Sequence, residues 1–244
     1  MSIALVTGAN RGLGFAAARA LAREGACVLL AGRDQAKAEQ AAATLRDEGL
    51  DVQPIQLDVT SPDSVAAAAK RVAQGQGRLD VLVNNAGVLP EAVDGTRHEF
   101  GNPDLFRATF DTNLFGAVAV TEAFLPLLQR SPMGRIVNVS TTMGSLNDQA
   151  DPDSPYYQMI VPAYQASKAA LNSVTISLAK KLAGTGIKVT SVCPGFVQTD
   201  LTPVNKAQAP LTADEAARIV CIAATLPDDA ATGSFIDQNG LVAW

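Results

Sequence analysis

The stretch Thr7-Gly8-Ala9-Asn10-Arg11-Gly12-Leu13-Gly14 decides the fold. An apolar run at residues 3–7 leads into it and an Ala-rich helical pattern at 13–23 follows, so it joins a strand to a helix. Glycines in such a turn admit a pyrophosphate close to the backbone, and the helix start offers free N–H groups and a positive dipole end. The stretch therefore predicts a dinucleotide-binding loop, with cofactor contacts from Gly8, Asn10, Arg11, Gly12, Leu13 and Gly14.

Beyond this loop, short apolar runs alternate with longer helical patterns. We expect further strands at residues 27–31, 52–58, 81–83, 135–139, 188–192 and 234–236. We expect helices at residues 34–47 and 104–129, after Ser61, around Tyr164 and after Thr212. Such alternation predicts an α/β fold, a three-layer, doubly wound parallel sheet of the Rossmann type. No repeat or break in composition appears, so residues 1–244 are predicted to form a single domain.

Composition and charge exclude several classes of function. The chain of 244 residues is 48% hydrophobic and carries a net charge of -5 without basic clusters, which disfavours nucleic acid and anionic membranes as partners. The three cysteines lie far apart and His98 is the single histidine, so no metal site is expected. The sequence shows neither the features of a signal peptide nor an apolar run approaching the roughly 18 residues that a membrane span needs. We therefore expect a cytoplasmic protein.

The end of the second predicted strand bears on the choice of cofactor. A site for NAD usually places an acidic residue there to bind the ribose 2′-hydroxyl. Here the strand ends in Ala31-Gly32-Arg33, and Asp34 is more simply the N-cap of the next helix. Arg33 and Arg11 could bind a 2′-phosphate through charge-assisted hydrogen bonds, the alternative being that both lie on a solvated surface. The pattern favours NADP (NADPH) over NAD.

A tyrosine and a lysine lie one helical turn apart in Tyr164-Gln165-Ala166-Ser167-Lys168. A free phenol has a pKa of about 10 and exchanges protons poorly near neutral pH. A neighbouring ammonium favours the phenolate and lowers that pKa. The pair is a candidate acid/base device, although a solvated helix edge is the commoner meaning of such a pair alone.

Five motifs in order resemble those of the short-chain dehydrogenase/reductase family over essentially the whole chain. They are the glycine loop, Asn84-Asn85-Ala86-Gly87, Asn113 within Thr112-Asn113-Leu114-Phe115-Gly116, Tyr164 with Lys168, and Pro194-Gly195 followed by Thr199. The runs Asn84 to Val88 and Ala31 to Asp34, together with Trp244, look most like the carbonyl-reductase branch.

The resemblance implies a role for each matching residue. Tyr164 would be the general acid in reduction or the base in oxidation, and Lys168 would bind the nicotinamide ribose and lower the pKa of Tyr164. Asn113 would hold a water molecule that links Lys168 to solvent. The remaining cofactor contacts would come from Asp58 and Val59 near the adenine, and from Asn85, Ala86, Gly87, Ser140, Pro194, Gly195, Val197 and Thr199.

One position departs from the family pattern. The family usually has Asn-x-Ser-Ser after the fifth strand, and its second serine binds the substrate carbonyl. This chain reads Asn138-Val139-Ser140-Thr141. A threonine hydroxyl can make the same hydrogen bond, although its methyl group restricts the rotamer. We therefore assign carbonyl polarisation to Thr141 and keep Ser140 as the alternative.

Three irregular segments, residues 88–103, 142–162 and 196–211, follow strands at the edge where such sheets bind ligands. The last two hold no basic cluster for coenzyme A or a phosphorylated sugar. An apolar pocket could be lined by Met143, Leu146, Met159, Ile160 and Phe196, with ordinary loop packing as the alternative. We expect a small hydrophobic ketone or aldehyde as substrate, and the resemblance favours a homo-oligomer. The competing hypothesis is a dinucleotide-sensing or scaffold protein without catalysis.

Overall fold

The computed structural model describes residues 1–96 and 98–244, and its centre is one eight-stranded sheet. The spatial order is β3-β2-β1-β4-β5-β6-β7-β8, and every neighbouring pair is parallel except β7 with β8. The strands are β1 (Ile3–Val6), β2 (Cys27–Gly32), β3 (Val52–Gln56), β4 (Val81–Asn84), β5 (Arg135–Val139), β6 (Lys188–Val192), β7 (Ser234–Asp237) and β8 (Gly240–Leu241). The strand order reverses between β1 and β4, and ligands of such sheets bind at this switch point.

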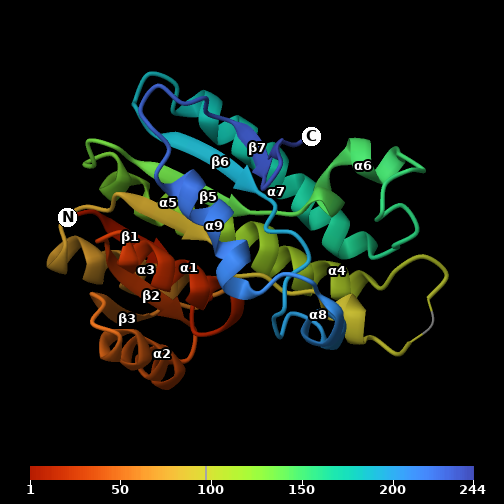
Figure 1. Cartoon of the computed structure of the whole chain (residues 1–244), viewed down its shortest axis with the longest axis horizontal. Coiled ribbons are helices and arrows are strands. Elements are labelled where there is room, and N and C mark those ends of the chain that lie inside the picture. The colour runs from red at the N-terminus through yellow and green to blue at the C-terminus, as the bar shows by residue number, and fades with distance from the viewer. Residues whose placement is uncertain (97) are drawn as a thin grey trace.

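Helices cover both faces of the sheet, so the molecule has three layers (Figure 1). One face packs against α1 (Gly12–Arg23), α2 (Gln35–Asp47) and α9 (Ala213–Ala224). The other packs against α3 (Pro62–Gly75), α5 (Ala117–Leu128) and α7 (Pro162–Lys181). Successive side chains of β1 alternate between the two apolar clusters, as strand geometry requires. The predicted doubly wound α/β fold is confirmed.

The predicted helix starts are confirmed by their caps. Asp34 accepts a hydrogen bond from the N–H of Lys37 at the start of α2. Ser61 caps α3, whose first residue is a proline. Thr212 forms a capping box with Glu215 at the start of α9. Each cap satisfies backbone donors that the first helical turn leaves free, so these residue types mark where helices begin.

The structure differs from the sequence prediction where segments are short or irregular. The helix expected at 104–129 is divided into α4 (Pro103–Phe110) and α5 by a π-helical turn, η2 (Asp111–Gly116). Four short helices lie within the segments expected to be irregular: η1 (Pro90–Val93), η3 (Thr142–Gly144), α6 (Leu146–Ala150) and α8 (Pro203–Gln208). Pieces this short show no hydrophobic period, so the sequence pattern could not reveal them. In Figure 1, α4, α6 and α8 lie beyond the carboxyl ends of the parallel strands.

Two kinds of feature are absent from the described residues. None of their helices is both long and apolar enough to cross a membrane. Nor do three or more His, Cys, Asp or Glu side chains gather there in a way that could hold a metal ion.

Candidate active site

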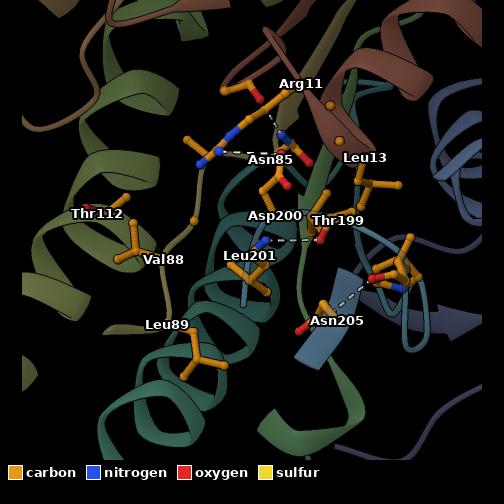
Figure 2. Close-up of a pocket in the computed structure, with 18 of the residues that line it drawn as sticks. Arg11, Leu13, Asn85, Val88, Leu89, Thr112, Thr199, Asp200, Leu201 and Asn205 are labelled. Carbon is orange, nitrogen blue, oxygen red and sulfur yellow. Dashed lines mark hydrogen bonds and ion pairs between the residues drawn. The ribbon is translucent and has the colours of Figure 1, made fainter. Parts of the chain in front are cut away.

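A pocket of about 1280 Å³ opens at the carboxyl ends of the parallel strands. Its wall takes residues from the segments that follow β1 to β6, so it spans the switch point of the sheet. Figure 2 shows Val88 and Leu89 on one side of this pocket and Thr199 and Asn205 on the other. Every residue that the sequence assigned to the cofactor lines this pocket, and Thr141 does too.

The glycine loop lies against the segment that follows β4. A Cβ atom on Gly14 would come within 2.4 Å of Asn85 Nδ2 and 2.7 Å of the Gly8 carbonyl oxygen, so only glycine fits there. Asn85 Nδ2 donates to the Thr7 carbonyl over 2.7 Å, and its backbone N–H donates to Thr7 Oγ1 over 2.9 Å. Gly8 and Gly12 have φ values of +62° and +58°, the region that side chains disfavour. These contacts fix the loop before any ligand arrives.

The start of α1 is the last part of this loop, and it has no side-chain cap. Arg11 occupies the N-cap position, and its side chain makes no capping hydrogen bond. The first N–H groups of α1 are thus left for an anion, together with the positive end of the helix dipole. This arrangement can bind a pyrophosphate, as the glycine pattern predicted.

Two cations line the end of the pocket beside β2 and α2. Arg33 follows β2, and Lys37 lies one turn into α2 on the same side. Lys37 Nζ lies 3.9 Å from the Asp34 carboxylate. Asp58 and Val59, which follow β3, complete this part of the wall. Lys37 was not predicted from the sequence, although its four-residue spacing from Arg33 was the available signal.

Arg11 lines the same pocket as Arg33, and their joint role at a 2′-phosphate stays a prediction. The Arg11 guanidinium forms an ion pair with Asp200 over 3.6 Å, and Asp200 also binds Lys206 over 3.1 Å. The hydrogen bond from Lys206 is the main cause that lowers the pKa of Asp200. Arg11 therefore connects the glycine loop to the 196–211 segment across the pocket, as Figure 2 shows.

Tyr164 and Lys168 are both buried on α7, with exposed fractions of 8% and 4%. Lys168 Nζ lies 5.8 Å from the centre of the Tyr164 ring and donates to the Val139 carbonyl oxygen over 2.7 Å. Burial lowers the pKa of Lys168 to about 8. Burial, and to a smaller extent Cys193, raises the pKa of Tyr164 above its usual value. The expected lowering of the Tyr164 pKa is absent here because loss of water outweighs the ammonium, which points at Val139.

Asn113 lies in the π-helical turn η2 and does not line the pocket. Its Oδ1 accepts a hydrogen bond from Val88 N over 2.8 Å. Its Nδ2 donates to the Val88 carbonyl over 3.0 Å and to Ser167 Oγ over 3.1 Å. The side chain thus joins the segment after β4 to α7. Protein atoms bind both ends of its amide. The water relay expected at Asn113 stays a prediction.

Ser140 and Thr141 offer different hydroxyl groups to the pocket. Ser140 Oγ is buried without a hydrogen-bond partner in the structure. Thr141 Oγ1 accepts a hydrogen bond from the N–H of Met143 over 3.2 Å, which leaves its own hydrogen free to donate. Accepting that bond orients the hydroxyl for a second partner. The geometry thus suits Thr141 as a donor to a carbonyl oxygen.

The remaining wall of the pocket is largely apolar. Met143, Met159 and Phe196 line it as expected. Four further residues of this wall were not predicted from the sequence: Leu89, Leu201, Val204 and Tyr156. Leu146 and Ile160 do not line it and are 65% and 76% exposed, so their assignment was wrong. Burial raises the pKa of the Tyr156 phenol, which therefore keeps its proton. No local signal distinguishes these positions, because separate segments bring them together.

Comparisons with known proteins agree with this geometry. A family model described as short chain dehydrogenase matches residues 2–210. The chain is 38% identical to a short-chain dehydrogenase, anuI, of Penicillium roqueforti, with 91% of this chain and 88% of the relative covered. It is 32% identical to (+)-neomenthol dehydrogenase of Capsicum annuum, with 95% and 94% covered.

Among solved structures, NADPH-bound carbonyl reductase from chicken fatty liver superposes with a TM-score of 0.84 at 26% identity, and the match covers 100% of both chains. The shared fold therefore extends from the glycine loop to the segments beyond β5 and β6. The matched family model covers the glycine loop, Asn113, Tyr164 and Lys168 alike. The chain belongs to the short-chain dehydrogenase/reductase family, with a carbonyl-reductase-like character.

Proposed function

We propose that this protein is an NADP-dependent reductase of small hydrophobic ketones or aldehydes. Family membership establishes the coarser activity, NAD(P)-dependent oxidoreduction between C–OH and C=O groups. The observation that carries the finer proposal is the pocket itself, which has cations at one end and apolar side chains around a buried tyrosine at the other.

The residues present fit an NADP molecule. The start of α1 has no side-chain cap, so its first N–H groups are free for the pyrophosphate, and Gly8, Gly12 and Gly14 line the pocket beside it. Arg33 and Lys37, which line the pocket beside β2, would hold the 2′-phosphate, and the nearby Asp34 carboxylate caps α2. When bound, the nicotinamide supplies the hydride or accepts it. The protein supplies the binding, the orientation and the proton.

The proton chemistry favours reduction near neutral pH. Because burial raises the pKa of Tyr164, its phenol keeps its proton and can give it to the oxygen of a carbonyl that is being reduced. Thr141 donates a second hydrogen bond to that oxygen and stabilises its growing negative charge. Lys168, mostly protonated below its pKa of about 8, adds positive charge beside the phenol. Oxidation would need the phenolate and is expected to increase with pH.

The substrate class follows from the wall around Tyr164. Leu89, Met143 and Leu201 are apolar, whereas Arg33 and Lys37 line the pocket beside β2 and α2. A neutral carbonyl compound can enter such a site without the free-energy cost of removing a charge from water. The proposal is preferred to the scaffold hypothesis because the chain keeps Tyr164 and Lys168 close together on α7 and Asn113 bound to Ser167 between them.

Initial rates of NADPH and NADH oxidation against a panel of cyclic ketones, aromatic aldehydes, acyl thioesters and phosphosugars test the proposal. We expect turnover of the first two classes and a preference for NADPH. Turnover restricted to thioesters or phosphosugars, or a strong preference for NADH, would contradict it. Thr141→Ala and Ser140→Ala distinguish the two hydroxyls: the assignment of Thr141 fails if only the loss of Ser140 abolishes turnover.

The proposed assembly is a homo-oligomer. Phe115 of η2 and Val118 of α5 are exposed large apolar side chains close together in the chain, at 58% and 41%. A second copy could cover them. Light scattering during size-exclusion chromatography measures the mass, and a monomer at micromolar concentration would contradict this part of the proposal.

A further inference from the structure

The helix that carries the catalytic tyrosine has no N-cap of its own. Val161 occupies the N-cap position of α7 and offers no side-chain acceptor. Pro162, the first helical residue, has no N–H to satisfy. The next two donors, the N–H groups of Ala163 and Tyr164, are the ones that an N-cap side chain normally binds.

Both donors bind one carboxylate from a distant part of the chain. Ala163 N donates to Glu91 Oε1 over 3.1 Å, and Tyr164 N donates to Glu91 Oε2 over 2.8 Å. Glu91 belongs to η1, and the sequence separations are 72 and 73 residues. A carboxylate at a helix start also interacts favourably with the positive end of the dipole. Glu91 thus replaces the missing cap and holds the backbone of Tyr164 itself.

Glu91 belongs to the segment that forms part of the pocket wall. Val88 and Leu89 line the pocket just before it. The backbone of Val88 is held by Asn113, and Asn113 in turn binds Ser167 on α7. Residues 88–91 are therefore attached to α7 directly through Glu91 and indirectly through Asn113. The wall that faces a substrate and the helix that carries its proton donor are connected by hydrogen bonds at both ends of this segment.

We propose that Glu91 is a positioning residue, which sets the catalytic tyrosine against the substrate wall by binding the first turn of α7. The proposal rests on the proposed role of Tyr164 and extends it to a group that touches neither substrate nor cofactor. The carboxylate does two things that a local cap on α7 could not do together. It satisfies the helix start, and it holds residues 88–91 at a fixed distance from Tyr164.

Steady-state kinetics of Glu91→Ala with NADPH and the best ketone of the panel give the first test. We expect kcat to fall at least tenfold while the Kd of NADPH, measured by fluorescence, changes less than twofold. Glu91→Gln keeps one acceptor oxygen and should retain more of kcat than Glu91→Ala. Glu122→Ala removes an exposed carboxylate from α5 and should change neither quantity. An unchanged kcat in Glu91→Ala would overturn the proposal.

The double variant Glu91→Ala/Val161→Asp separates positioning from simple capping. The new aspartate gives α7 a local cap but cannot hold residues 88–91. We expect it to restore the Tm lost in Glu91→Ala without restoring kcat. If kcat returns together with Tm, Glu91 is only a helix cap and the proposal fails.

Hydrogen exchange makes the test independent of turnover. Glu91→Ala, with or without Val161→Asp, should speed exchange in residues 88–93, and Glu122→Ala should not. Unchanged exchange in residues 88–93 would overturn the proposal even if kcat fell. A wild-type protein that reduces no carbonyl would instead contradict the proposed function, while the exchange result would still decide whether Glu91 holds the two segments together.

Discussion

The cofactor end and the substrate end of the pocket are built in different ways. At the cofactor end, backbone groups do most of the work: glycines approach closely, strand ends carry the loops, and the start of α1 lies open. At the substrate end, side chains join segments far apart in the sequence, as in the bonds of Glu91 to α7 and the ion pair of Arg11 with Asp200. A backbone-built site is fixed by local sequence, whereas a side-chain-built site depends on single distant residues. The two ends should therefore respond differently to mutation.

The largest effect should come from Tyr164→Phe, which removes the proton donor and leaves the cofactor end intact. We expect kcat to fall by roughly 10²–10⁴, the usual contribution of a general acid. The Kd of NADPH, measured by fluorescence titration, should change little. An equal loss of cofactor binding would show that the two ends are not separable.

Gly14→Ala should damage the cofactor end alone. The added methyl group would approach Asn85 Nδ2 and the Gly8 carbonyl within 2.7 Å, so the loop must move. We expect NADPH affinity to fall about 100-fold and stability to fall by about 1–3 kcal/mol, the usual cost of overpacking. Gly75→Ala is the matched control, since nothing lies within 4 Å of its added Cβ, and it should leave binding and Tm nearly unchanged. Equal behaviour of the two variants would contradict a backbone-built site.

The preference for NADPH tests the side chains within the cofactor end. Arg33→Ala/Lys37→Ala removes both cations that line the pocket beside α2. Hydrogen bonds to charged groups contribute about 1.5–3 kcal/mol each, so the loss of both should lower the NADPH-to-NADH ratio of kcat/KM by about 100-fold or more. The rate with NADH should stay close to that of the wild type. A preserved ratio would mean that other groups bind the 2′-phosphate.

A smaller effect concerns stability and pH. The pKa of Lys168 is lowered from 10.5 to about 8 in the folded protein, so between these values the unfolded chain binds more protons than the native one. Stability should then rise with pH across this window through Lys168, because unfolding takes up a proton there. Lys168→Met removes this pH-dependent contribution to the free energy of unfolding. We expect the Tm difference between Lys168→Met and wild type to be largest below pH 8, in favour of the variant, and to shrink toward pH 10.5. A difference that is constant with pH would contradict the lowered pKa.

The smallest effect should come from Asp200→Asn, which breaks the ion pair across the pocket. Both side chains are well exposed, so the pair contributes at most about 1 kcal/mol. We expect NADPH to dissociate up to about fivefold faster in stopped-flow measurements at low salt. The difference should vanish at high salt, where exposed charges are screened. A salt-independent change would point to a rearranged loop instead.

The sequence predicted the cofactor end well because its signals are local. The bounds of β5 and β6, the caps Asp34, Ser61 and Thr212, and the glycine loop all follow from neighbouring residues. The substrate end escaped prediction where tertiary contacts decide. Glu91 binds residues more than 70 positions away, and Arg11 meets a carboxylate in a distant loop. Nothing near Leu146 or Ile160 indicates that these apolar side chains face solvent.

The shift in the pKa of Tyr164 shows the same limit of prediction from sequence. Spacing places Lys168 beside the phenol, but it cannot show how far burial outweighs the ammonium or that Lys168 binds the Val139 carbonyl. Pair chemistry can be read from a sequence, whereas desolvation requires the whole fold.

The π-helical turn between α4 and α5 is a place where a mutation could remove the site and leave the fold intact. A π turn amounts to an extra residue within an α-helix. Deleting a residue from 111–116 would let α4 and α5 merge into a regular helix, at little cost to the architecture. The same deletion would withdraw Asn113 from Val88 and Ser167. A single deletion in this turn could therefore abolish the activity. The protein would keep its fold and its dinucleotide site, on which another function could evolve.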